Sequence, residues 1–319
     1  MNDPAKQPID IDAERRWLLE HKEAGGLSWS AIAKRINIPP GTISSFGGGN
    51  YKGNLENIAN TIFKYRQLLQ TQAQITTEVP EVPGYFETPT SKELEVLLKW
   101  AQRGRIVVAA LGPGLGKTST AREFVECYPN VALATMSPST AGVNNMQLEV
   151  LAALGDGDAV GTPQKLSRRI RDRVRDLGNP VLIIDEAQHL SEKSVEEIRS
   201  WHDAERVGIA LFGNIQVMQR LEGGSRKAAY AQLFSRIGLK LVRELPLEGD
   251  CDALAAAWNI AGPREIEFIR KIGRMPGGLR GATMTLEIAT MVAQSDDEPL
   301  SVQHLTDAWA QLSSRRAAA

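Results

Sequence analysis

Eight residues in the middle of the chain have the composition of a loop that binds phosphate. The run from Leu111 to Thr118 reads Leu-Gly-Pro-Gly-Leu-Gly-Lys-Thr, after an apolar stretch at 106–111 and before a helical pattern at 119–128. Glycines allow backbone N–H groups to converge on phosphate oxygens, and the start of the following helix adds a favourable dipole. Lys117 is expected to contact the β- and γ-phosphates of ATP, and the Thr118 hydroxyl to ligate Mg²⁺. The strict pattern has glycine where Leu111 stands, so we expect a different entry into the loop.

Polar residues end two further apolar stretches, at 181–184 and 207–212. Asp185 is expected to hold the magnesium shell and Glu186 to polarise the attacking water, as phosphoryl transfer requires. Asn214 is expected to lie between that water and the γ-phosphate, although an asparagine there also suits a turn. The predicted catalytic residues of this set are Glu186 and Asn214, and the predicted nucleotide-binding residues are Gly112, Pro113, Gly114, Leu115, Gly116, Lys117, Thr118, Ser119 and Asp185.

The elements that must position these residues alternate between strands and helices. Strand-like runs at 106–111, 131–136, 181–184 and 207–212 are separated by helical patterns, which is typical of a parallel sheet covered on both faces. Four helical segments follow from about residue 246, and a stretch rich in proline and threonine precedes the sheet. We predict an all-α domain at 1–74, a linker at 75–90, an α/β ATPase core at 91–245 and an all-α helical domain at 246–319.

Length and composition exclude several classes of protein. The chain has 319 residues, which suits two or three domains, and is 42% apolar and 24% charged, as in globular proteins. Its apolar runs are too short to span a bilayer, and its polar, acidic start is not a secretory signal. Two cysteines, Cys127 and Cys251, cannot form a disulfide framework. We expect a location in the cytoplasm, here that of a bacterial host, with no membrane partner.

The segment 28–46 has the spacing of a helix-turn-helix. Apolar residues fall at inward positions, Ala33 is small where two helices would cross, and Asn37 stands at the turn, where positive φ is wanted. Short polar groups on the second helix suit contacts with DNA phosphates better than base readout. The alternative is a small helical module that binds no DNA. The predicted DNA-binding residues are Lys34, Arg35, Thr42, Ser44 and Ser45.

A run of basic residues at 165–175 occupies one predicted helix of the ATPase core. Leu166, Ile170, Val174 and Leu177 form its apolar stripe, so the basic side chains are expected to point outward. The two interpretations are a solvated charged face and a face that contacts DNA phosphates without sequence specificity. The predicted contacts to double-stranded DNA are Lys165, Arg168, Arg169 and Arg173.

The order of these parts resembles the AAA+ ATPases. The resemblance gives a meaning to two arginines in the second half of the chain. Arg236, in Leu-Phe-Ser-Arg-Ile, lies where that family carries an arginine finger donated to a neighbouring subunit, and Arg243 and Arg226 are rival positions. Arg280 lies where a helical lid supplies a second contact to the γ-phosphate. A donated finger implies that hydrolysis requires self-association into a ring or a helical filament.

The combination of parts narrows the resemblance further. The helix-turn-helix, the segment Pro-Gly-Tyr-Phe-Glu-Thr at 83–88, the run Asp-Glu-Ala-Gln-His-Leu at 185–190 and the helical tail are similar to the phage Mu transposition protein B family. The resemblance covers about 28–309. It implies an ATP-dependent, largely nonspecific DNA-binding protein that assembles on target DNA, delivers it to a transposase and stimulates transposition. The alternatives are a helicase loader and a transcriptional regulator with a nucleotide switch.

Overall fold

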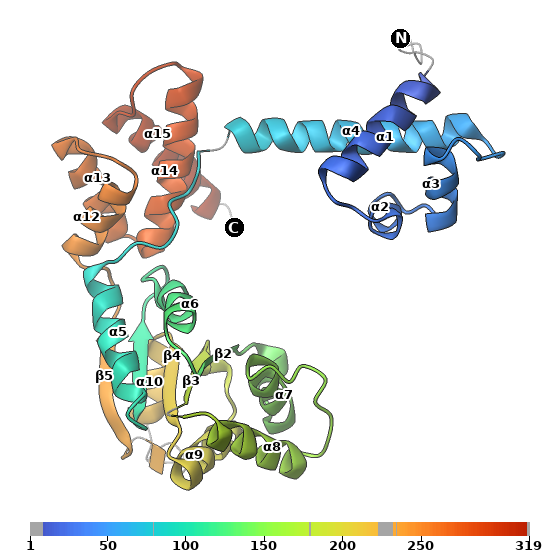
Figure 1. Ribbon diagram of the computed structural model, residues 1–319. Helices are drawn as coiled ribbons and strands as arrows, with labels where there is room; N and C mark the ends of the chain where they lie inside the picture. Colours follow the sequence, from blue (N-terminus) through green and yellow to red (C-terminus); the bar gives the residue numbers. More distant parts are fainter. Residues whose placement is uncertain (1–8, 79, 179, 223–231, 234, 318–319) are drawn as a thin grey trace. The chain divides into compact units, whose positions relative to one another are not determined.

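The structure is a computed structural model that describes residues 9–78, 80–178, 180–222, 232–233 and 235–317 (Figure 1). Arg226, one of the rival finger positions, lies outside the described residues. The chain divides into two compact units, Met1–Pro80 and Glu81–Ala319. Each unit has hydrophobic clusters of its own, and each is described separately below.

The first unit is all α-helical. Its helices are α1 (Ile11–Ala24), α2 (Trp29–Ile36), α3 (Pro40–Gly47) and α4 (Leu55–Glu78). Ser28 caps the start of α2 through a bond to the Ala31 N–H, and Asn37 ends it with φ of 54°, as the turn position requires. The buried core of the unit is Leu18, Ile32, Ala33, Ile43, Phe46, Ile58, Ala59 and Ile62.

A five-stranded parallel sheet forms the centre of the second unit. The strands are β1 (Ile106–Leu111), β2 (Val131–Thr135), β3 (Val181–Asp185), β4 (Gly208–Gly213) and β5 (Ile237–Arg243), in the order β2-β3-β4-β1-β5. Four of them lie where the apolar runs predicted strands. The edge strand β5 was not predicted, because it is largely exposed and Gly238 falls at a shift in its register with β1.

Helices cover both faces of this sheet. On one face lie α5 (Pro89–Ala101) and α6 (Lys117–Cys127), which bury apolar side chains against alternate residues of β1. On the other lie α7 (Val143–Ala153), α8 (Pro163–Asp176), α9 (Glu192–Glu205) and α10 (Ile215–Glu222). The continuous apolar runs of the inner strands follow from this burial on two sides. The predicted α/β core is thus confirmed.

Four helices close the second unit: α12 (Glu248–Ala257), α13 (Pro263–Gly273), α14 (Gly278–Ser295) and α15 (Val302–Ala317). They enclose a separate core that includes Leu254, Ile269, Leu286 and Leu305. We call these four helices the lid. The buried carboxylate of Asp250 joins the lid to α5, because it accepts hydrogen bonds from the N–H and hydroxyl of Thr90.

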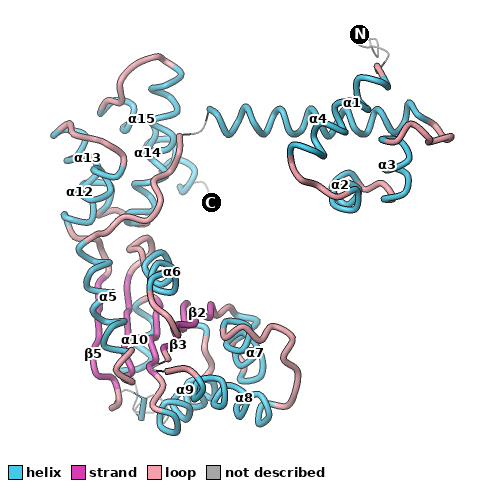
Figure 2. The backbone as a smooth tube through the Cα atoms, viewed as in Figure 1, coloured by secondary structure: helices cyan, strands magenta, loops and turns pink. Residues whose placement is uncertain are grey.

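The segment expected to be an extended linker differs from the 75–90 predicted. Helix α4 continues through Glu78, since the first proline of the segment is Pro80, and Pro89 already begins α5 behind a Thr88 capping box. The described residues before α5, 80–88, form an extended loop (Figure 2). Its Phe86 packs against the apolar cluster of the lid. None of the helices in the described part of the chain is long and apolar enough to cross a membrane.

Candidate nucleotide-binding and hydrolysis site

The predicted phosphate loop joins β1 to α6, as its chemistry requires. Leu111 is the last residue of β1, with its side chain in the core and its carbonyl at the loop. The Lys117 ammonium donates to the carbonyls of Leu111 at 2.8 Å and Gly112 at 2.9 Å. Residue 111 thus contributes its backbone carbonyl to the loop, while its side chain belongs to the core.

Two glycines of this loop lie against other backbone. A Cβ at Gly112 would stand 2.1 Å from the Glu244 carbonyl, just after β5. A Cβ at Gly114 would stand 2.2 Å from the Gly277 carbonyl, and Gly114 also has φ of +75°. The glycines therefore admit close approach by the end of the sheet and by the lid, in addition to leaving N–H groups free for phosphate.

The Thr118 hydroxyl and the Asp185 carboxylate meet in the site. Thr118 Oγ1 donates to Asp185 Oδ2 at 2.6 Å, and the Glu186 N–H donates to Asp185 Oδ1 at 2.9 Å. The Asp185 side chain is 1% exposed. No cluster of three or more His, Cys, Asp or Glu side chains suited to a metal occurs among the described residues. One hydroxyl and one carboxylate suit Mg²⁺, which takes its remaining oxygens from phosphates and water.

Burial and the charge of Arg280 act in one direction on the pKa of Lys117, and the charges of two carboxylates act in the other. Burial lowers the pKa of its ammonium below the ordinary lysine value, and Arg280 lowers it further, whereas Asp185 and Glu186 raise it. The lysine lies on α6, Asp185 ends β3, Glu186 follows directly after that strand, and the arginine lies on α14. The site therefore holds cationic groups of the core and of the lid close together, an arrangement that fits a polyphosphate.

Glu186 and Asn214 are linked by a residue that the sequence did not single out, Gln188. Its Nε2 donates to Glu186 Oε2, and its Oε1 accepts from the Asn214 N–H at 3.3 Å. Asn214 lines the cavity described below, and its Oδ1 also accepts from the Gln216 N–H at 2.9 Å at the start of α10. The Asn214 side chain thus makes a turn contact, and the residue also lines the cavity; its catalytic role stays a prediction. The run at 185–190 offered no signal for Gln188 beyond its nearness to Glu186.

A cavity of about 870 Å³ lies between the core and the lid, a volume in the usual range for ligand sites. Pro113 through Ser119, Glu186, Gln188 and Asn214 line its inner part from the core. The loop at 82–86 and the lid residues Leu254, Trp258 and Met284 add an apolar part. One half of the cavity is thus lined by phosphate-binding chemistry and the other by apolar and aromatic side chains.

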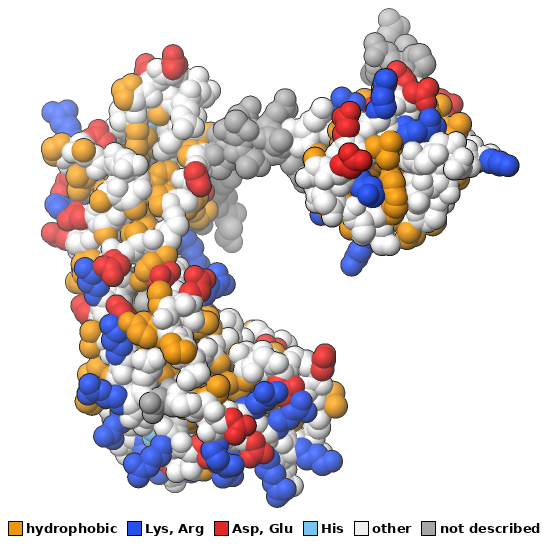
Figure 3. Space-filling view, viewed as in Figure 1, with side chains coloured by type: hydrophobic (Ala, Val, Ile, Leu, Met, Phe, Trp, Pro, Cys, Tyr) orange, Lys and Arg blue, Asp and Glu red, His pale blue; other side chains and the backbone are white. Residues whose placement is uncertain are grey.

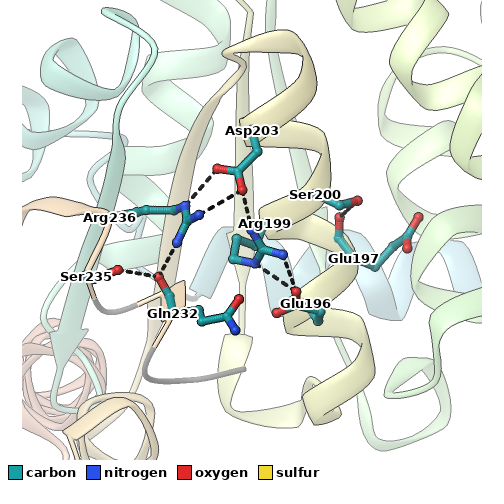
Figure 4. Close-up of polar contacts among 8 residues, drawn as sticks. All are labelled: Glu196, Glu197, Arg199, Ser200, Asp203, Gln232, Ser235 and Arg236. Carbon is teal, nitrogen blue, oxygen red and sulfur yellow. Dashed lines mark hydrogen bonds and ion pairs between the residues drawn. The ribbon is translucent and has the colours of Figure 1, made fainter. Parts of the chain in front are cut away.

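The three described arginines proposed for γ-phosphate contact lie in different surroundings. Arg280, on α14, lines the cavity, and a Cβ at Gly114 would stand 2.8 Å from its backbone nitrogen. Arg236 lies before β5 and binds Asp203 of α9 at 2.7 Å and 3.0 Å (Figure 4). Arg243 donates to Thr90 and Glu93 of α5. The side chain of Arg236 is 33% exposed, whereas that of its rival Arg243 is 19% exposed.

The residues predicted to contact DNA occupy two surfaces. In the first unit, Lys34 and Arg35 are exposed, and Thr42, Ser44 and Ser45 are partly exposed on α3. On α8, Leu166, Ile170 and Val174 are buried and the basic side chains point outward, as predicted. Acidic side chains lie among the basic ones on this surface (Figure 3). Arg169 binds the buried Asp156 through two nitrogens.

The four predicted α8 contacts therefore divide into two pairs. Arg169 and, at 4.0 Å, Arg173 neutralise Asp156. Lys165 and Arg168 are exposed and have no acidic partner within the described residues. Arg171 and Arg175, which were not predicted to contact DNA, bind Glu205. Lys165 and Arg168 are thus the α8 cations best placed to meet a phosphate.

The sheet and the site together define an AAA ATPase. A family model described as an AAA domain matches residues 102–221. Among solved structures, the ORC1 protein of Aeropyrum pernix in complex with DNA aligns with a TM-score of 0.54 and 16% identity, covering 74% of this chain and 68% of that one. That likeness supports the fold alone.

The chain belongs to the Mu B transposition protein family. A model described as Mu B transposition protein, C terminal, matches residues 235–312. The ATP-dependent target DNA activator B of Escherichia phage Mu is 33% identical over 304 residues, which are 95% of each chain. The Mu-like prophage FluMu DNA transposition protein B of Haemophilus influenzae is 31% identical over 271 residues, covering 84% of this chain and 93% of the relative.

Proposed function

We propose that this chain binds ATP with Mg²⁺ between the core and the lid and couples its hydrolysis to assembly on target DNA. The observation that carries the proposal is the 2.6 Å bond between Thr118 and Asp185, at the wall of the cavity that Thr118 and the half-buried Lys117 line. These are the groups that a magnesium nucleotide needs on the enzyme. The apolar half of the cavity, with Trp258 and Phe86, fits the base.

Each site residue has a role in this proposal. Thr118 and Asp185 would hold Mg²⁺, which would neutralise charge on the transferred phosphoryl group. Lys117 exchanges the carbonyls of Leu111 and Gly112 for phosphate oxygens. Glu186 takes the proton of the attacking water, Asn214 orients that water, and Arg280 contacts the γ-phosphate from the lid. Arg236 acts on the nucleotide of a neighbouring subunit, so turnover rises with self-association.

Double-stranded DNA and a transposase are the proposed partners. The names of the relatives refer to target DNA activation and DNA transposition. Family membership supports assigning the same functions to this chain. Lys165 and Arg168 offer cations for nonspecific phosphate contact, and Lys34, Arg35 and the hydroxyls of α3 offer a second set. We propose that ATP-bound subunits form a helical filament on DNA of any sequence and present it to the transposase.

The test is binding to random-sequence duplex DNA with ATP, with ADP and without nucleotide, followed by electron microscopy and salt titration. We expect filaments on any sequence with ATP only, and affinity that falls steeply with salt. Lys117→Ala should lose both nucleotide binding and stable DNA binding, whereas the surface variant Lys99→Ala should retain them. Protection of one defined site would favour a regulator, and closed rings that ignore DNA would favour a helicase loader. Either result would overturn the proposal.

A further inference from the structure

The side chain of Gln188 makes two directed contacts inside the candidate hydrolysis site. Gln188 belongs to a short 3-10 turn, η2 (Ala187–His189), which follows Glu186, and it is 8% exposed. Its Oε1 faces the Asn214 N–H at the end of β4. Because a backbone N–H can only donate, this contact fixes which end of the amide is the acceptor. The Nε2 end is therefore turned toward Glu186 Oε2.

The surroundings of Gln188 hold the amide in this orientation. A Cβ at residue 213 would stand 2.5 Å from Gln188 Oε1, so the side chain fits only because Gly213 ends the neighbouring strand. From α10, the Arg220 guanidinium donates to the carbonyl of Gln188 and, at 3.4 Å, to that of Leu190. Both the backbone and the side chain of Gln188 are thus held by the elements around it.

We propose that Gln188 is a positioning residue for ATP hydrolysis, which holds the Glu186 carboxylate in one orientation through the bond to Oε2. The inference rests on the proposed role of Glu186 as the base. Glu186 itself has φ of 54°, in the left-handed region. Its side chain therefore lacks the direction that regular strand geometry would give it. The neutral amide donates one hydrogen bond to Glu186 Oε2, which leaves Glu186 Oε1 available to a water molecule. Because the directed contact of the Gln188 amide is with the base, it sets the rate of the chemical step rather than affinity.

Steady-state and single-turnover ATPase measurements on the full chain with DNA test this role. The variants are Gln188→Leu, Glu186→Gln and the double variant, with Gln219→Leu as a matched control on the exposed side of α10. We expect Gln188→Leu to lower kcat about tenfold to a hundredfold, the effect of one hydrogen bond to a charged group, while KM and the Kd for ATP stay within about twofold. In the Glu186→Gln background the same change should have no further effect.

A second variant guards against a trivial loss of folding. Gln188→Asn keeps the amide but is one methylene shorter, so it should show the same fall in kcat with ATP affinity retained. A parallel loss of kcat and ATP affinity in both variants would make Gln188 a structural residue and overturn the inference. An unchanged kcat in Gln188→Leu, with Glu186→Gln slow, would overturn it as well but leave the proposed function standing. A rapid Glu186→Gln enzyme would instead remove the base assignment itself.

Discussion

The guanidinium of Arg236 binds both carboxylate oxygens of Asp203, with Nε 2.7 Å from Oδ1 and a second nitrogen 3.0 Å from Oδ2. A third nitrogen donates to the Gln232 carbonyl at 2.8 Å. Asp203 also accepts from Arg199, which binds Glu196 one turn earlier on α9 (Figure 4). Within one subunit, then, each of the three guanidinium nitrogens of Arg236 donates to its own chain. Donation to a neighbouring nucleotide would require exchange of Asp203 for the phosphate.

Mixing of two inactive variants should restore ATPase activity if Arg236 acts between subunits. Arg236→Ala keeps an intact nucleotide site but donates no finger, and Glu186→Gln donates a finger but has no base. In a random one-to-one mixture about a quarter of the interfaces join an intact site to an intact finger. We expect roughly that fraction of wild-type activity in steady-state assays at concentrations where the protein assembles. Activity no higher than that of the separate variants would contradict the assignment.

Removal of two cations from α8 should reduce the salt dependence of DNA binding. For Lys165→Ala with Arg168→Ala, the slope of log K against log salt should fall by about 1.8, or about 0.9 for each lost phosphate contact. The measurement is fluorescence anisotropy on random duplex DNA with ATP. The control removes Lys92 and Lys99, which have the acidic partners Glu87 and Glu95 on another face. An equal change in both double variants would point to a general charge effect rather than to a contact.

Replacement of Asp250 should destabilise the junction between core and lid. Its carboxylate is fully buried and accepts from the N–H groups of Thr90 and Leu247, each at 2.8 Å. Asp250→Ala leaves these donors without their acceptor and should lower the free energy of unfolding by about 3 kcal/mol in urea titrations. Asp252→Ala, which removes a partly exposed ion pair with Arg270, should cost about 1 kcal/mol or less. Equal effects would contradict the importance of the junction.

The two cysteines should differ in their reaction with a thiol reagent. Cys127 is exposed, and its hydrogen bond to Glu123 raises the pKa of the thiol above its usual value. Burial raises the pKa of Cys251 to about 11. Since the thiolate reacts, labelling of Cys127 should accelerate as pH rises beyond 9, and Glu123→Ala should accelerate it at pH 8. Absorbance at pH 8 should report one equivalent in the folded protein and two after denaturation. Two rapid equivalents would mean that Cys251 is not protected.

The fold was predictable wherever burial was complete. The inner strands of a covered parallel sheet are continuous apolar runs, which predicted their bounds closely, and the helical period after residue 246 predicted the four lid helices. The edge strand β5 has Lys240 and exposed Leu239 and Val242, and its type is set by pairing with β1 rather than by its own pattern. Likewise, nothing between Gln74 and Glu78 breaks a helix, although the composition there resembles a linker.

The residues of the candidate site that belong to recognisable sequence motifs were predictable. Thr118 and Asp185 are 67 residues apart, and the motifs alone indicated that they meet. Gln188 was missed because its role depends on the end of β4, where Gly213 leaves room for it. The pairing of Arg169 with Asp156 was also not predictable from the sequence, since Asp156 lies 13 residues away in the loop before α8. Contacts between elements, rather than the elements themselves, were therefore the part that required the structure.

The approach of Gly114 to Gly277 joins the phosphate loop to the lid without any side chain. Because the two backbones lie this close, a displacement of Gly114 by bound phosphate would be felt at Gly277, next to the start of α14, which carries Arg280. The lid would then register an occupied site by contact alone, whatever residues cover its surface. Such a contact does not depend on the side chains that cover the rest of the lid, whereas a side chain at Gly114 or Gly278 would clash with the opposite backbone. The outer faces of the lid helices can therefore vary in sequence to suit a binding partner.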